Sequence, residues 1–569
     1  MRTQHLLAAL TVCAAVSAQA HKQWKLQVSW DRYFVYGEVE GLMKRIAATW
    51  PEFVRMQSIG KSTQGRDLWL FVVNNQKTGP EERKAAFYSD ANIHGNEVQG
   101  AETNLYLVWY LMEHYGKVKK ITELVDQRVL YVLPTMNVDG RAYWFDHPNT
   151  SSSSRSGQKP TDNDGDGLFD EDGPDDLDGD GEILMMRKKV PGDGNMKLDP
   201  DDPRLMVPVK PGEKGDYVML GLEGIDNDGD GQINEDGPGG YDLNRNWPSG
   251  WAPNWIQSGA GDYPFSYPET RAVADFIRTH PNIAGVQAFH NAGGMILRGP
   301  GYATHGEYPA PDVTVYDEIG KTGEEMLPFY RYMVIWRDLY TVWGGFVNWT
   351  YEGQGIFSFT NEQWNEKQLW QSDAPKDRKA AMKWDDQLSF GENFVDWKPF
   401  KHPFYGDIEL GGRRKMTGRV APTFLIEEML HRNAAFVVYH ADQMPLLEMR
   451  APQLEKLGDG VFAVTATVAN PRVIPTRSAQ AAQKKLGRPD LFTVTGDTAR
   501  VVAAGYVQDR FHKNLVDRVD KEPGRLRVEA GVPGRGELKV RFVVVGSGKL
   551  TLRYEAEKGG VVTSEVELR

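Results

Sequence analysis

The chain has 569 residues, of which 40% are hydrophobic and 25% charged, so it can form a large core and more than one domain. Its formal net charge is −12, but eleven acids and no Lys or Arg lie between residues 162 and 182, and five more acids lie between 226 and 236. The acidity is therefore local, which argues against nucleic acid as a partner at these loops and indicates a local cation instead.

The N-terminal segment is typical of a secretory signal peptide. A basic residue, Arg2, precedes an apolar run from Leu6 to Val16, and the small residues Ala18 and Ala20 mark a cleavage site. We expect residues 1–20 to be removed and the protein to be secreted or periplasmic. A short membrane anchor is the alternative, but the apolar run is too short to span a bilayer comfortably and no later stretch is longer, so we expect no membrane span.

The single cysteine, Cys13, lies inside that segment. The mature chain therefore has no disulfide and no cysteine to act as a nucleophile or a metal ligand, which fits a bacterial envelope or medium. Any metal site must use His, Asp, Glu and backbone oxygens.

Residues 30–150 alternate helical and strand patterns. Apolar residues at helical spacing predict helices over 38–50 and 97–116, and apolar runs predict strands over 67–75, 84–95 and 127–140. This alternation predicts an α/β fold with a mixed central sheet flanked by helices. In such sheets ligands bind beyond the carboxyl ends of strands, and His94 and Asn137 lie at such ends.

Residues 150–240 are rich in Gly, Asp, Pro and Ser and show little apolar periodicity. They contain a repeat, because "DNDGDGLFDEDGP" at Asp162 returns as "DNDGDGQINEDGP" at Asp226, with a partial third copy, "DLDGDGEI", at Asp176. The α/β pattern resumes at "YDLNRNWP" and continues to a helix over 424–444.

After about Pro445 the sequence changes to short alternating strands separated by Gly and Asp turns, which predict a β-sandwich. We therefore expect a signal peptide at 1–20, a catalytic α/β domain at 21–445 with an Asp/Gly-rich insertion at 150–240, and a β-sandwich domain at 446–569.

Three residues could hold a catalytic zinc ion. His94 and Glu97 are close together in "NIHGNEVQG", and His290 follows another apolar strand in "GVQAFHNAGG". Catalytic zinc takes three protein ligands and one water, and two His with one Glu make a suitable set. A strand-end His is more often structural, and a His-x-x-Glu pair is common by chance, so these residues alone do not establish a site.

Further motifs accompany them in order along the chain. "SIGKSTQGRDLWLF" begins at Ser58, "YDLNRNWP" carries Asn244 and Arg245, and "DLYTVWGGFVNWTYEGQGIFSFTNE" ends in Glu362. Together the motifs resemble the zinc carboxypeptidase (metallocarboxypeptidase) family over about residues 33–362. The resemblance implies a zinc-dependent peptidase that acts on peptides or proteins with a free C-terminus.

The resemblance also implies a role for individual residues. It makes His94, Glu97 and His290 the ligands of one zinc ion and Glu362 the general base. A carboxylate suits that role because it can take a proton from water and pass it to the leaving amine. Tyr340 would be the mobile tyrosine that closes over the substrate.

The other implied roles concern substrate binding. Arg245, with Asn244, would hold the terminal carboxylate, for which an arginine fork is the natural partner. Arg66 would lie in an outer subsite. Val347 falls where the family lines the pocket for the end residue, and a valine there favours a neutral apolar or aromatic side chain.

The sequence departs from the family pattern in two places. The family has an oxyanion-stabilising arginine before the Asn-Arg pair, and Arg187 in "ILMMRKKVPG" is the candidate, although its spacing is not a clean match; the alternative is a surface arginine. After the third ligand a Ser-Tyr pair is replaced by Asn291-Ala292, which could alter the outer subsites.

Two other acids are rival bases. Glu427 and Glu428 also follow an apolar segment, but acids at the start of a helix are common because they interact favourably with the helix dipole. We prefer Glu362, because its upstream context matches the family through Tyr340, Gly344, Gly345, Trp349 and Tyr351.

The acidic repeats predict calcium sites. Alternating Asp with Gly at the sixth position is the pattern of an EF-hand-like loop, although the twelfth position has no Glu. The alternative is a flexible acidic loop without an ion. The candidate calcium ligands are Asp162, Asp164, Asp166, Asp176, Asp178, Asp180, Asp226, Asp228 and Asp230. Their place before Asn244 suggests that calcium rigidifies the rim of the active site.

Three hypotheses about function follow from these patterns. The leading one is a secreted, monomeric zinc exopeptidase with calcium loops. The first alternative is a zinc amidase or peptidase that acts on cell-wall peptides, which also carry free carboxylates. The second is a calcium-dependent binding protein on an inactive peptidase scaffold; the presence of the ligands, the base and the carboxylate clamp speaks against it.

Overall fold

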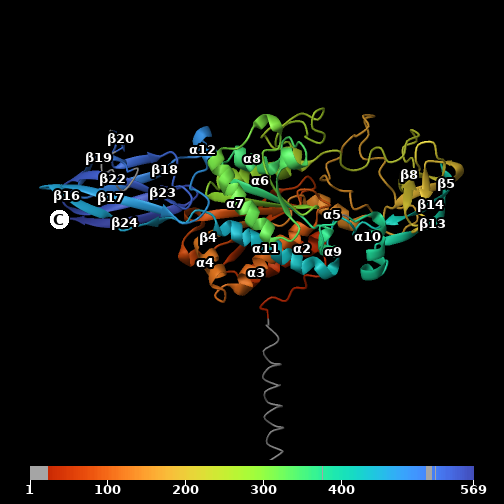
Figure 1. Ribbon diagram of the computed structural model, residues 1–569, viewed down its shortest axis with the longest axis horizontal. Coiled ribbons are helices and arrows are strands. Elements are labelled where there is room, and N and C mark those ends of the chain that lie inside the picture. The colour runs from red at the N-terminus through yellow and green to blue at the C-terminus, as the bar shows by residue number, and fades with distance from the viewer. Residues whose placement is uncertain (1–23, 375, 508–515, 520) are drawn as a thin grey trace, which may run out of the picture.

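The computed structural model describes residues 24–374, 376–507, 516–519 and 521–569. The predicted signal peptide lies outside these residues. The C-terminal strands form one end of the long axis, the α/β part forms the middle, and the acidic insertion forms the other end (Figure 1). Within the described ranges no helix is both long and apolar enough to cross a membrane.

An eight-stranded mixed sheet with the order β1-β2-β4-β3-β9-β12-β10-β11 forms the centre of the molecule. Its strands are β1 (Val54–Lys61), β2 (Asp67–Val73), β3 (Ala85–Ala91), β4 (Arg128–Leu133), β9 (Ile283–Asn291), β10 (Met295–Arg298), β11 (Arg331–Val334) and β12 (Phe357–Gln363). β4, β3, β9 and β12 pair in parallel, and β3, β4 and β9 are buried along their whole length. Such continuous burial is expected where helices cover both faces of a sheet.

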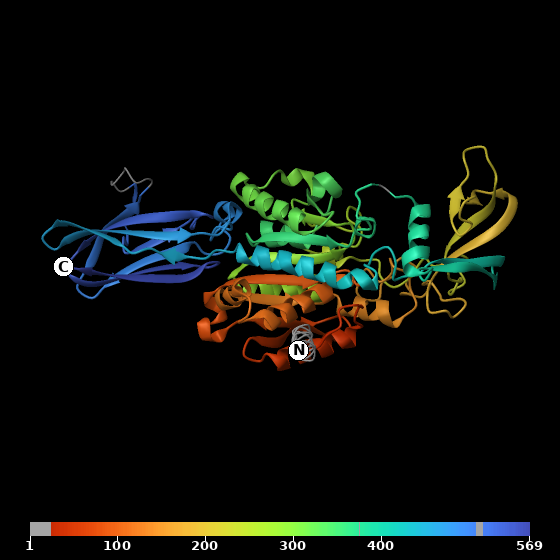
Figure 2. The ribbon, with the colours of Figure 1, turned by 60° about the horizontal axis from the view of Figure 1, so that its bottom comes forward.

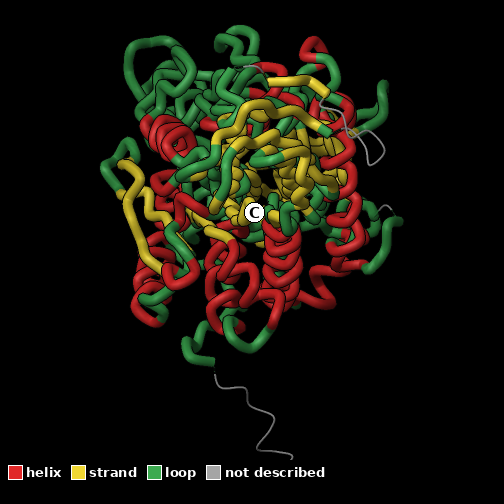
Figure 3. Tube along the Cα trace, turned by 90° about the vertical axis from the view of Figure 1, so that its left-hand side faces the viewer, coloured by secondary structure: helices red, strands yellow, loops and turns green. Residues whose placement is uncertain are grey.

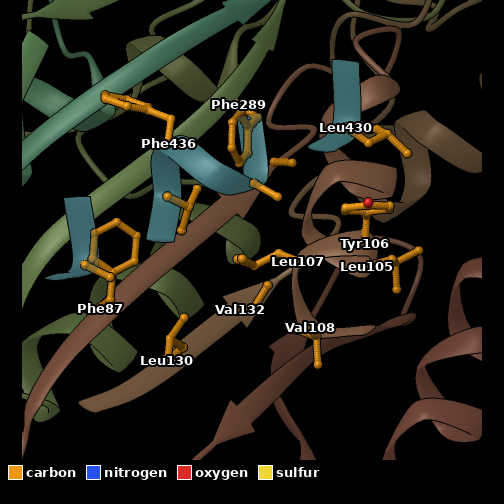
Figure 4. Packing of buried hydrophobic residues seen from close by; sticks show 14 of the residues in the cluster. Phe87, Leu105, Tyr106, Leu107, Val108, Leu130, Val132, Phe289, Leu430 and Phe436 are labelled. Carbon is orange, nitrogen blue, oxygen red and sulfur yellow. The ribbon is translucent and has the colours of Figure 1, made fainter. Parts of the chain in front are cut away.

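Helices cover the two faces of the sheet (Figure 2), and successive residues of a strand belong to the cores on opposite faces. One layer contains α2 (Tyr36–Thr49), α3 (Gln99–His114), α4 (Lys119–Gln127), α7 (Ala310–Met326) and α11 (Ile426–Asp442), and the other contains α6 (Pro268–Thr279) and α8 (Phe346–Glu352). Phe87 and Leu130 pack in the first layer, near Leu105 of α3 and Phe436 of α11 (Figure 4), while Tyr88 and Tyr131 pack in the second. The predicted α/β fold with a mixed central sheet is confirmed.

The insertion contributes four strands to a second sheet that the sequence patterns did not predict. Six antiparallel strands follow the order β13-β14-β5-β8-β6-β7. They are β5 (Met185–Gly194), β6 (Met196–Leu198), β7 (Met206–Pro208), β8 (Gly215–Leu222), β13 (Phe394–His402) and β14 (Gly406–Arg413). Two distant chain segments therefore build this sheet, and its many half-exposed positions leave only a weak apolar pattern in the sequence.

The C-terminal strands form two antiparallel sheets around one core, seen end-on in Figure 3. One sheet contains β15 (Glu448–Met449), β16 (Gln453–Gly458), β17 (Val461–Asn470), β19 (Arg500–Tyr506), β20 (Val516–Val519) and β22 (Gly536–Val545). The other contains β18 (Asp490–Gly496), β21 (Arg525–Val528), β23 (Gly548–Ala556) and β24 (Gly560–Leu568). Phe462 and Phe542 of the first sheet share a core with Phe492 and Leu552 of the second, so the sheets pack face to face.

Further short α-helices are α5 (Val138–Asp146), α9 (Lys367–Trp370), α10 (Arg378–Trp384) and α12 (Ala479–Lys484).

Candidate active site

Three separate motifs meet at the carboxyl edge of the central sheet. His94 follows β3, His290 is the penultimate residue of β9, and Glu362 lies near the end of β12. Parallel pairing aligns Ala91 of β3 with Phe289 of β9, and Glu362 with His290. The register of adjacent parallel strands therefore places these side chains together, where open α/β sheets bind ligands.

His94, Glu97 and His290 converge on one point. His94 Nδ1 lies 2.9 Å from Glu97 Oε1, and His290 Nδ1 lies 2.9 Å from Glu97 Oε2. The three donor atoms lie within 4.8 Å of one another, and each residue is buried. Two imidazole nitrogens and one carboxylate are a donor set typical of catalytic zinc, so these residues fit that ion.

Asp242 orients one member of this ligand set, His94, through the ring nitrogen that faces away from Glu97. Its Oδ1 lies 3.0 Å from His94 Nε2, and its carboxylate also accepts hydrogen bonds from the Asn244 N–H at 2.7 Å and from Arg155 Nε at 3.1 Å. A carboxylate on the outer nitrogen of a metal-binding histidine fixes the tautomer and the ring orientation. Burial would raise the pKa of Asp242, but His94, Arg245 and Arg155 hold that pKa well below its usual value.

Glu97 is also kept ionised. Burial would raise its pKa, but His94 and His290 keep that pKa well below the ordinary glutamate value. For Glu362 the balance is reversed, because desolvation and then the charge of Glu97 raise its pKa to about 7. A carboxyl group with a pKa near neutrality is well suited to accept and return a proton.

A cleft of about 370 Å³ opens beside these residues. Arg245 and Asn244 form part of its wall, and the Asn244 Oδ1 accepts a hydrogen bond of 2.9 Å from the Phe346 N–H. Gly344 allows the two segments to approach, because its φ is +63° and an added Cβ would lie 2.3 Å from the Arg245 carbonyl oxygen.

Part of the cleft wall is apolar. Its aliphatic and aromatic lining includes Met295, Leu297, Ile335, Leu339, Val342, Phe346 and Val347. Val347 is buried on α8, whereas Tyr340 is 51% exposed at the rim, directly after the single turn Ile335–Leu339. The structure therefore brings Tyr340 and Val347 to the same cleft as the candidate zinc ligands.

The prediction for Arg187 was wrong. Arg187 lies on β5 in the insertion sheet, where its Nε donates to Glu409 Oε2 at 2.6 Å and its guanidinium stacks 4.1 Å from the Trp397 ring. It is absent from the lining of the cleft. Figure 1 shows β5, the strand that contains Arg187, at the far end of the molecule.

Arg66 does not line the cleft either. It precedes β2, and its Nη1 donates to Asp139 Oδ1 at 2.7 Å, while the guanidinium lies 5.9 Å from the Tyr36 ring. The outer-subsite role of Arg66 therefore stays a prediction.

The rival bases lie elsewhere. Glu427 and Glu428 are in the first turn of α11, outside the cleft, and Glu428 Oε1 accepts a hydrogen bond of 2.8 Å from Arg432.

Two arginines that the motifs did not identify reach the cleft. Arg155 Nη1 lies 3.3 Å from Glu97 Oε1, and Arg419 Nη1 lies 3.7 Å from the same oxygen. Arg155 stands in the Ser-rich segment before the first Asp-Gly repeat, where no motif pointed to it. Arg419 follows β14, beyond every motif, and no sequence pattern pointed to it.

The three Asp-Gly loops have the same local geometry. In each, the first Asp accepts backbone hydrogen bonds from the glycines at the fourth and sixth positions, as Asp162 does from Gly165 at 2.6 Å and Gly167 at 3.1 Å. Asp226 and Asp176 repeat this arrangement. In the third loop, Asp176 and Asp178 lie within 4.8 Å of Glu223. Glu223 directly follows β8, and the sequence pattern had not included it.

Comparison with known proteins gives one family for the α/β part. The sequence model of the zinc carboxypeptidase family matches residues 39–182 and 215–383, more than half of the chain, and a domain of unknown function matches residues 446–567. Carboxypeptidase M of Mus musculus is 37% identical over 112 residues, which cover 19% of this chain and 25% of that protein. Carboxypeptidase A1 of Bos taurus is 22% identical over 342 residues, which cover 58% of this chain and 62% of that protein.

The chain thus spans less than two thirds of the length of these curated relatives. Among solved structures, carboxypeptidase A of Helicoverpa armigera is similar at 16% identity and a TM-score of 0.44, covering 77% of this chain and 80% of that one. Thrombin activatable fibrinolysis inhibitor is similar at 18% identity and a TM-score of 0.43, covering 73% of this chain and 74% of that one.

Proposed function

Because the chain belongs to the zinc carboxypeptidase family, we propose that it is a secreted metallocarboxypeptidase that hydrolyses the C-terminal peptide bond of peptides or proteins. One observation carries the proposal: the zinc-type donor set of His94, Glu97 and His290 shares a single cleft with Glu362 and Arg245. A catalytic centre and a carboxylate-binding group in one cleft are what an exopeptidase requires.

We assign His94, Glu97 and His290 as the ligands of one zinc ion. When bound, zinc supplies Lewis-acid chemistry, which polarises a carbonyl group and lowers the pKa of water. The hydrogen bond between His94 Nε2 and Asp242 supports this assignment, since it holds the imidazole with Nδ1 directed at Glu97.

Glu362 is the proposed general base. It takes the proton of the attacking water and delivers it to the nitrogen of the leaving amino acid, and its pKa of about 7 suits both transfers at neutral pH. Arg155 replaces Arg187 as the proposed oxyanion group, because its guanidinium lies at the cleft beside Glu97 and can donate hydrogen bonds as negative charge develops on the carbonyl oxygen.

Arg245, with Asn244, would bind the terminal carboxylate of the substrate. Arg245 is buried at 7% exposure, and its Nη1 donates to the Asn244 carbonyl oxygen at 2.9 Å, so its guanidinium is held in position at the cleft wall. A bidentate arginine–carboxylate contact would fix the end of the chain and prevent internal cleavage.

The apolar part of the cleft lining, which includes Val347, supports a preference for neutral apolar or aromatic end residues. Tyr340, half-exposed at the rim, would close over the bound substrate. A terminal Lys or Arg that is released much faster than Phe or Leu would overturn this preference.

The remaining assignments are proposals of the same kind. The catalytic unit would extend to residue 445, with a separate β-sandwich unit at 446–569, and the protein would act as a secreted or periplasmic monomer. The three Asp-Gly loops would bind calcium. Cell-wall peptides are the second candidate substrate, because they also present a free carboxylate to Arg245.

The test is digestion of a mixed peptide pool by the mature protein, followed by mass spectrometry, with half of each peptide amidated at its C-terminus. The proposal expects loss of single residues from free-acid peptides only, abolished by a zinc chelator and restored by zinc. Internal cleavage, or equal attack on amidated ends, would contradict it. No cleavage of the pool, together with release of residues from cell-wall peptides, would favour the second candidate.

A further inference from the structure

The two full Asp-Gly repeats lie against each other. An isolated antiparallel bridge joins Asp172 of the first repeat to Asp236 of the second, and each backbone N–H donates to the other residue's carbonyl oxygen, at 3.2 and 3.1 Å. The repeats are therefore one structural unit rather than two independent loops.

Each repeat places an acid in the loop of the other. Asp236, from the second repeat, lies within 4.8 Å of Asp162 and Asp164 in the first, and accepts hydrogen bonds from the N–H groups of Asn163 at 3.0 Å and Asp170 at 3.1 Å. The first loop also brings Asp164 and Asp166 together with its own Glu171.

The second loop mirrors this arrangement. Asp172, from the first repeat, lies within 4.8 Å of Asp228 and Glu235 in the second. It accepts hydrogen bonds from the Asn234 N–H at 3.0 Å and from Asn227 Nδ2 at 3.1 Å. The exchange of acids is thus reciprocal.

These carboxylates lack a compensating positive charge. Asp172 and Asp236 are fully buried, and both side-chain oxygens of Glu171 and of Glu235 are enclosed without any hydrogen-bond donor. Among the residues that the structure describes, no Lys or Arg forms an ion pair with any of the four. Enclosed, unpaired carboxylates are unfavourable unless a cation balances them, and clusters of carboxylate and carbonyl oxygens are the ligands that calcium prefers.

We propose that the two repeats form a linked pair of calcium sites, each completed by an acid from the other repeat, and that this pair positions Arg155 and the Asn244–Arg245 segment in the cleft. The second half of the proposal rests on the proposed function of that cleft, whereas the first half does not.

Two short segments connect the pair to the cleft. Residues 155–163 lead from Arg155 into the first loop, and residues 236–245 lead from the second loop to Arg245. The segments are tied together by Asn163 Nδ2, which donates to the Gly237 carbonyl oxygen at 3.0 Å, and by the Lys159 N–H, which donates to the Tyr241 hydroxyl at 2.8 Å.

The same two segments meet again at the active site. Ser156 Oγ donates to the Tyr241 carbonyl oxygen, and Arg155 Nη2 lies 3.0 Å from Asp242 Oδ2. Asp242 in turn holds His94 and the Asn244 N–H. Release of calcium would loosen both segments at their outer ends and allow the carboxylate clamp and Arg155 to move.

Double variants test the exchange of acids, with calcium counted by native mass spectrometry on the zinc-loaded mature protein at about 1 mM calcium. Asp162→Asn/Asp236→Asn affects one shared site and is expected to bind one calcium fewer than the wild type. Asp162→Asn/Asp172→Asn affects both sites and is expected to bind two fewer. Asp193→Asn, an exposed acid on the same insertion, is the matched control and is expected to bind as the wild type does.

If Asp162→Asn/Asp236→Asn lost two calcium ions and Asp162→Asn/Asp172→Asn lost one, each site would be confined to its own repeat. That result would overturn the proposal. Equal losses in the two double variants, or no calcium on the wild-type protein, would overturn it as well.

Hydrogen exchange tests the link to the cleft without relying on peptidase activity. Calcium is expected to slow backbone exchange at residues 156–161 and 237–245 by about tenfold, with no change in β17 and β22, and Asp162→Asn/Asp236→Asn is expected to lose this protection. Unchanged exchange at 237–245 while calcium is bound would overturn the link.

If the proposed function is correct, kcat/KM for a free-acid peptide should fall when the protection of residues 156–161 and 237–245 from hydrogen exchange is lost. If no peptide is cleaved under any condition, the proposed function fails, while the calcium counts and exchange rates still decide the present inference.

Discussion

The replacement of Arg155 by Met tests whether Arg155, rather than Arg187, stabilises the oxyanion. Met keeps much of the length and apolar volume of the side chain but removes the hydrogen bonds to Asp242 and Glu97. Loss of one oxyanion-hole donor typically lowers kcat about 100- to 1000-fold, or about 2.7–4 kcal/mol. Arg419, 3.7 Å from Glu97, remains as a nearby cation, so we expect the smaller effect, about 100-fold.

The assay is steady-state hydrolysis of a free-acid peptide by zinc-saturated enzyme, with the zinc content of each variant measured. We expect kcat to fall while KM changes little, because the lost interaction strengthens only as charge develops on the carbonyl oxygen. Added guanidinium should restore part of the activity of Arg155→Met. Arg187→Met, which alters the pair with Glu409 in the insertion sheet, is the control and should keep near-normal kcat.

A kcat for Arg155→Met within about threefold of the wild type, at full zinc occupancy, would refute the assignment. So would an equal loss in Arg187→Met that guanidinium does not rescue, since that result would place the effect in the insertion sheet.

Three further predictions concern other parts of the molecule. Asp242→Asn should weaken zinc binding about 10- to 100-fold, because the group that orients His94 loses its charge; zinc competition with a chromophoric chelator would show an unchanged Kd if this is wrong. Val347→Asp should shift the preferred end residue from Phe or Leu toward Lys or Arg in competition assays, and an unchanged preference would remove Val347 from the pocket. Desolvation raises the pKa of Asp490 from 3.8 to about 6, so the folded state binds more protons than the unfolded state between those values and stability falls as pH rises through them. Asp490→Asn should remove that loss, which is worth about 3 kcal/mol by pH 7, and denaturant titrations would contradict it if the difference from the wild type did not change with pH.

The fold and the core of the candidate site could be predicted because their signals are local in the sequence. Strands β3 and β9 are mainly apolar runs, and His94, Glu97 and His290 stand shortly after or at the end of those runs. The register of parallel strands then brings them together without any further information.

The errors arise where position depends on distant segments. Arg187 has the expected residue type and lies before Asn244 in the sequence, but the insertion sheet, whose strands β13 and β14 come from beyond residue 390, carries it away from the cleft. The acids Asp172 and Asp236 exchange between repeats through tertiary pairing, which a loop pattern read within one repeat could not reveal.

The role of Arg245 is the most direct test of the account, because it separates a carboxypeptidase from any other zinc peptidase on this scaffold. The measurement is kcat/KM for one peptide as a free acid and as an amide, with the wild type and with Arg245→Met. Charged hydrogen bonds contribute about 1.5–3 kcal/mol each, so the wild type should prefer the free acid by at least about tenfold, and the variant should lose most of that preference. Equal rates on both peptides with the wild type, or an undiminished preference in Arg245→Met, would contradict the account.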